Sequence, residues 1–140
     1  MGIAGGSTMT KRLWVAGIAA GLLAAAGEVP LRAHHSIAAQ FDMYKTNTVT
    51  GTITKMDFRN PHSWLYIDVK DEKGQAQSWS IEFGAANALY RRGWRREDLP
   101  VGSTVTITGY VARDGSRMLG ATDVKLADGR TLFAGEAPGR

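Results

Sequence analysis

Three histidines carry most of the chemistry that this sequence offers. His34 and His35 stand side by side, and His62 lies in the stretch Asn60-Pro61-His62-Ser63-Trp64. Imidazole nitrogen is a common ligand of copper and zinc. The chain contains no cysteine, which excludes thiolate metal sites, disulfides and cysteine nucleophiles. Metal binding through nitrogen and carboxylate ligands is therefore the most specific chemistry that these residues permit.

The beginning of the chain has the composition of a secretory signal. Lys11-Arg12 precedes Leu13 to Ala26, a run of 14 residues without charge. This run is shorter than the ~20 residues of a membrane-spanning helix, so we expect no retained transmembrane anchor. We favour cleavage after Ala33, with Ala26 as an earlier alternative. The mature protein is then expected in the periplasm or outside the cell.

Removal of residues 1–33 also changes the net charge. The full chain carries +4, and the signal takes away three basic residues and one acidic residue, which leaves +2. This small excess in an exported protein gives no reason to expect nucleic acid as a partner.

Cleavage after Ala33 would give His34 two ligands for one copper ion, its α-amine and its imidazole. His62 or His35 would supply a further nitrogen, and Glu82, Asp42 or Tyr66 would lie near the open positions. In its terminal histidine alone, the chain resembles histidine-brace copper proteins. A cut one residue earlier would place His35 third, where amine, amides and imidazole hold copper in a plane. The alternative is that His34 and His35 are simply the polar start of the mature chain.

The rest of the sequence predicts a mainly β protein, a small OB-like barrel of five to six strands with one short helix between strands three and four. We expect an N-terminal arm at 34–45, the barrel domain at 46–134 and a flexible tail at 135–140. The strands are expected from Val49 to Phe58, Leu65 to Val69, Trp79 to Phe83, Thr104 to Val111, Met118 to Leu126 and Thr131 to Phe133, with the helix from Ala85 to Gly93.

The second and third strands are predicted to form a hairpin. A three-residue loop at 72–74 pairs Trp64 with Glu82 and keeps both apolar sets on one side. His62 then lies diagonal to Glu82, about 7 to 8 Å away at the backbone. A metal can bridge this gap, or the two side chains can close it. The alternative for His62 is a hydrogen bond that caps the Asn60-Pro61 turn.

The outward face of the second strand offers a different function. Trp64, Tyr66 and Asp68 alternate with the core set and would form a surface for a peptide, glycan, small molecule or partner protein, with the histidines structural. The alternative is that Trp64 is covered by the arm. No His-Glu-x-x-His helix is present, and we predict no catalytic residues. Copper-dependent oxidation is the weakest of the three hypotheses.

Several motifs occur together with the histidines. They are Asn60-Pro61-His62-Ser63-Trp64, Asn87-Ala88-Leu89, Arg91-Arg92-Gly93-Trp94 and Asp128-Gly129-Arg130. With His34-His35-Ser36, this combination resembles a family of small exported bacterial domains of unknown function, from His34 to about Gly135. The resemblance implies no reaction, and it assigns no role to any residue.

Overall fold

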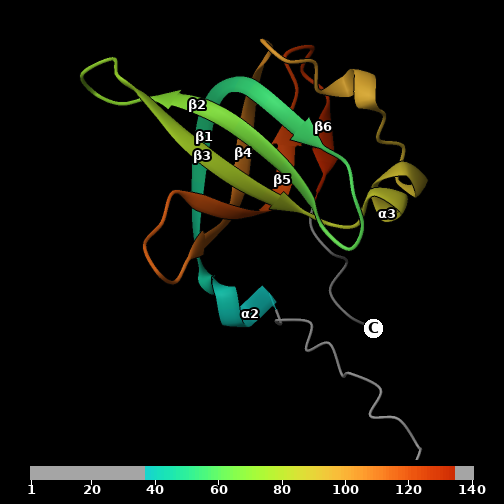
Figure 1. Cartoon of the computed structure of the whole chain (residues 1–140), viewed down its shortest axis with the longest axis horizontal. Helices are drawn as coiled ribbons and strands as arrows, with labels where there is room; N and C mark the ends of the chain where they lie inside the picture. Colours follow the sequence, from blue (N-terminus) through green and yellow to red (C-terminus); the bar gives the residue numbers. More distant parts are fainter. Residues whose placement is uncertain (1–36, 135–140) are drawn as a thin grey trace, which may run out of the picture. The chain divides into compact units, whose positions relative to one another are not determined.

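The computed structural model describes residues 37–134, which form a mainly β, OB-like barrel. Its six strands lie in the order β3-β2-β1-β4-β5-β6, and parallel pairing of β3 with β5 closes the barrel (Figure 1). The predicted fold class is confirmed. The elements are α2 (Ile37–Gln40), β1 (Phe41–Asp57), β2 (Ser63–Lys70), β3 (Ala76–Phe83), α3 (Ala86–Arg91), the 3-10 turn η1 (Arg96–Asp98), β4 (Thr104–Ala112), β5 (Met118–Lys125) and β6 (Thr131–Phe133).

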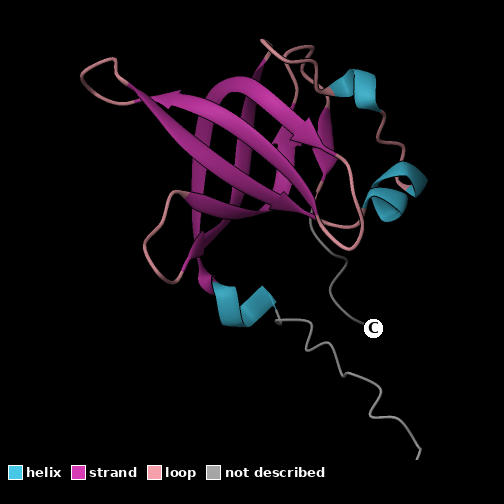
Figure 2. Ribbon diagram, viewed as in Figure 1, coloured by secondary structure: helices cyan, strands magenta, loops and turns pink. Residues whose placement is uncertain are grey.

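The helices of this segment are short and lie outside the sheet (Figure 2). The helix α3 connects β3 to β4 where the sequence predicted it, and Gly93 follows it with a φ of 96°, a conformation that favours glycine. Within residues 37–134, no helix has the length and apolar character to cross a membrane.

The inward side chains of the strands build the core. Ile53 of β1, Leu65 and Ile67 of β2 and Ile81 of β3 are each at most 1% exposed. Trp94 is also fully buried, and its Nε1 donates a hydrogen bond to the backbone oxygen of Phe133 at 3.0 Å. Trp94 lies between α3 and η1, outside the strands, so no strand periodicity predicts its burial.

The first strand begins earlier than expected, at Phe41 and not near Val49. Residues 41–45, predicted as part of the arm, belong to β1, although its pairing with β4 shifts register between Asp42 and Thr46. The Phe41 side chain is fully buried and packs on Gly120 of β5, where a β-carbon would lie 3.1 Å from its ring. This long-range contact holds the start of the strand against the barrel, whereas the Tyr44 side chain is 97% exposed.

Candidate functional site

His62 and Glu82 form the central pair of the candidate site. Nδ1 of His62 lies 2.8 Å from Oε1 of Glu82, so the side chains close the gap that the predicted register left between their backbones. The pairing of Trp64 with Glu82 is confirmed, and β2 and β3 pair without interruption from Ser63 to Lys70. The hairpin loop also has the predicted form, with Gly74 at a φ of 75°.

The turn before β2 is built by Ser63, which sequence reasoning did not select. Ser63 is fully buried, and its Oγ donates to the backbone oxygen of Arg59 at 3.1 Å and accepts from the Arg59 N–H at 3.3 Å. The Asn60–Pro61 peptide bond is cis, and Oδ1 of Asn60 accepts from the backbone N–H of Asn87 at the start of α3. Ser63 therefore caps the turn, and the contact shown for His62 is with Glu82.

In this pair, His62 is the hydrogen-bond donor and Glu82 is the acceptor. An ionised carboxylate only accepts hydrogen bonds, so the hydrogen of the imidazole lies on Nδ1, facing Glu82. Nε2 of His62 is left to donate or to coordinate, depending on protonation. The His62 side chain is 34% exposed and that of Glu82 only 13%, so the carboxylate is largely shielded while the imidazole is accessible to solvent. A histidine held in this way is oriented before any ligand arrives.

The three predicted ligand residues of β2 are half-buried, and two of them contact side chains of the barrel itself. The ammonium group of Lys55 lies 5.5 Å from the centre of the Tyr66 ring, and Asp68 accepts a hydrogen bond from the Ser78 hydroxyl at 2.9 Å. Trp64 is the third. Their use as a binding surface stays a prediction.

The remaining predicted metal ligands, His34 and His35, lie outside the described residues. Within 37–134, no three side chains of histidine, aspartate or glutamate gather into a metal-binding group. In this part of the chain, His62 and Glu82 are the predicted ligands that the fold brings together, and a stable metal site requires donors from elsewhere.

A family model matches residues 22–121, which is well over half of the chain; its description is "Family of unknown function (DUF6152)". The chain belongs to this family. The description agrees with the family of unknown function that the resemblance implies, while the motifs and export stay predictions. No curated protein matches the sequence.

Two solved structures are similar in fold. The mitochondrial single-stranded DNA binding protein Rim1 of S. cerevisiae is 15% identical, with a TM-score of 0.46, over 59% of this chain and 93% of that chain. The N-terminal domain of PriB from Thermoanaerobacter tencongensis is 18% identical, with a TM-score of 0.44, over 60% of this chain and 97% of that chain. Likenesses at this level carry no argument about what this chain binds.

Proposed function

We propose that this is an exported metal-binding domain that holds copper through Nε2 of His62 and the nitrogen donors of an N-terminal histidine. The observation that supports it best is the 2.8 Å contact between Nδ1 of His62 and the Glu82 carboxylate. Histidines that bind metals commonly donate their other ring N–H to a carboxylate, which fixes the tautomer and makes the free nitrogen a better ligand.

This geometry changes the role proposed for Glu82. The sequence suggested Glu82 as a direct metal ligand. In the structure its Oε1 contacts Nδ1 of His62, whereas the nitrogen proposed to coordinate copper is Nε2. Its low exposure also favours a supporting position over a ligand reaching into solvent. We therefore propose that Glu82 orients His62 so that Nε2 faces the metal.

The other ligands of the proposed site come from the mature N-terminus. Cleavage after Ala33 would supply the α-amine and imidazole of His34, with His35 as the alternative imidazole. Together with His62 this set consists of nitrogen ligands and contains no thiolate. Such a set favours copper over zinc, because Cu²⁺ has the highest affinity of the divalent series for nitrogen donors.

The test is a copper titration of the exported, processed protein, with its start at His34 verified by intact mass. His62→Ala should remove tight binding, and Glu82→Gln should weaken it by about tenfold, the usual effect of losing a carboxylate that orients a metal-binding histidine. Three additional glycines before His34 should weaken binding, because they separate the terminal amine from both imidazoles without placing His34 or His35 third. The matched control is Glu97→Gln, which changes an exposed glutamate of η1 and should leave affinity unchanged.

Unchanged copper affinity in His62→Ala would refute the proposed site. Loss in His62→Ala together with full affinity in Glu82→Gln would refute only the orienting role of the carboxylate. Loss of a protein or glycan partner in Trp64→Ala, without any copper effect in the histidine variants, would favour the outward-face alternative.

A further inference from the structure

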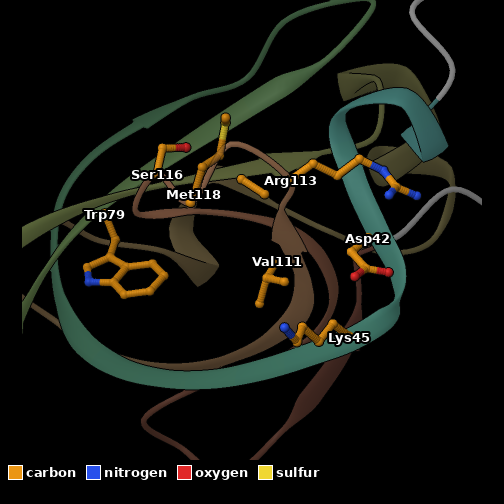
Figure 3. A pocket seen from close by; sticks show the side chains of 9 residues that line it. Asp42, Lys45, Trp79, Val111, Arg113, Ser116 and Met118 are labelled. Carbon is orange, nitrogen blue, oxygen red and sulfur yellow. The ribbon is translucent and has the colours of Figure 1, made fainter.

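A separate hollow of about 420 Å³ lies beside the start of β1, the end of β4 and the start of β5. The residues that surround it come from these strands, from the loop between β4 and β5 and from β3 (Figure 3). His62 and Glu82 do not line it. The six lining residues that matter here are Asp42, Lys45, Trp79, Val111, Arg113 and Met118.

The hollow exists because the inward side chains at this end are incompletely covered. Trp79 continues the inward series of Ile81 and Phe83, and Val111 continues that of Ile107, yet both are only half-buried. The alternation of Trp79 with Ile81 and Phe83 predicts a core position for this residue. The register shift in β1 between Asp42 and Thr46 interrupts regular pairing with β4 next to Val111, which explains the partial exposure of Val111.

Cationic side chains stand at the rim of this apolar wall. Lys45 is exposed, and Arg113 is fixed by a hydrogen bond from its Nε to the backbone oxygen of Ala38 at 2.9 Å. The carboxylate of Asp42 faces the same hollow and accepts a hydrogen bond from the Tyr44 N–H at 3.1 Å. The rim therefore combines two positive charges with one negative charge.

Trp79 also lines a neighbouring hollow of about 310 Å³, together with Lys70 and Arg117. Asp71 is the acidic residue of that lining. Its pKa is lowered, first by the hydrogen bond from the Gln75 backbone N–H, which keeps it ionised and engaged within its own loop. Each of the two hollows lined by Trp79 is thus also lined by two cationic residues and one acidic residue.

We propose that the larger hollow binds a small anionic ligand with a flat apolar group, of the aromatic carboxylate class. The flat group would pack against Trp79 and Val111, and the carboxylate would meet Lys45 and Arg113. A cavity of this size suits a small molecule, and apolar walls with a few placed charges are typical of such sites. This inference does not rest on the copper proposal.

The test compares 2-naphthoate with the neutral 2-naphthalenemethanol by ¹⁵N NMR titration of the metal-free processed protein. Naphthoate should shift the Trp79 indole N–H signal saturably and bind about tenfold more tightly than the alcohol, the gain expected from charge-assisted hydrogen bonds at an open rim. The double variant Lys45→Gln/Arg113→Gln should abolish this preference. Lys125→Gln, at an exposed lysine that does not line the hollow, is the matched control and should keep it.

Thermal melts of each variant verify that the barrel remains folded. The absence of a saturable shift at Trp79 would overturn the proposal. So would equal affinity for the acid and the alcohol in the parent protein, or unchanged naphthoate affinity in the folded double variant.

Discussion

Replacement of Ser63 by alanine tests how the turn before His62 is held. The hydroxyl of this fully buried residue both donates to and accepts from the backbone of Arg59. Each such hydrogen bond contributes about 0.5–1.5 kcal/mol net, and the Arg59 backbone oxygen keeps a second partner in the Ala86 N–H. We therefore expect Ser63→Ala to lower the free energy of unfolding by about 1–2 kcal/mol. For a domain of this size, each kcal/mol lowers Tm by roughly 4–8 °C.

Urea denaturation of the processed protein, followed by circular dichroism, measures this loss as a lower midpoint at constant slope. The matched control is Ser103→Ala, whose hydroxyl donates to the Pro100 oxygen at 2.8 Å in an exposed turn. It should change the free energy of unfolding by less than about 0.5 kcal/mol. If Ser63→Ala costs no more than this control, Ser63 does not hold the turn as we argue.

Three further outcomes are expected. Gly109→Ala should lower the free energy of unfolding, measured by urea denaturation, by about 1–3 kcal/mol, because the added β-carbon would lie 2.5 Å from a backbone oxygen of β5. Gly84→Ala, whose added β-carbon has its nearest contact at 3.9 Å, should cost far less. The pKa of Asp71 is held below its ordinary value of 3.8, first by the hydrogen bond from the Gln75 backbone N–H. The ionised carboxylate therefore stabilises the folded protein above that pH, and this stabilisation is lost as the pH falls. Asp71→Asn should reduce the fall in Tm between about pH 5 and pH 2. Trp94→Phe should lower the free energy of unfolding by about 1–3 kcal/mol in the same urea assay, since it removes the hydrogen bond to the β6 backbone and leaves space in the core. A change within error would show that neither the hydrogen bond nor the packing of Trp94 matters.

The hairpin of β2 and β3 shows where sequence reasoning succeeded. Period-two alternation assigned Leu65 and Ile67 to the core, and the glycine in a short loop set the register that pairs Trp64 with Glu82. These are local constraints, because a shift of one residue would turn both apolar sets outward. The proximity of His62 to Glu82 followed from the same register.

The start of β1 shows where it failed. Phe41 joins the strand because its ring packs on Gly120, nearly 80 residues away in the chain. No local pattern indicates such a contact. The register shift that follows lies next to Val111, which is half-buried, and Trp79 of β3 is half-buried as well although its alternation with Ile81 and Phe83 predicts a core position.

The sequence by itself determined the barrel class, the hairpin register and the proximity of His62 to Glu82, since alternation and short turns act within a few residues of one another. Only the tertiary structure decided that Ser63 closes the turn, that the carboxylate engages Nδ1, and that a hollow opens beside Trp79. These features depend on side-chain directions and on contacts between distant strands, which become defined only when the barrel closes.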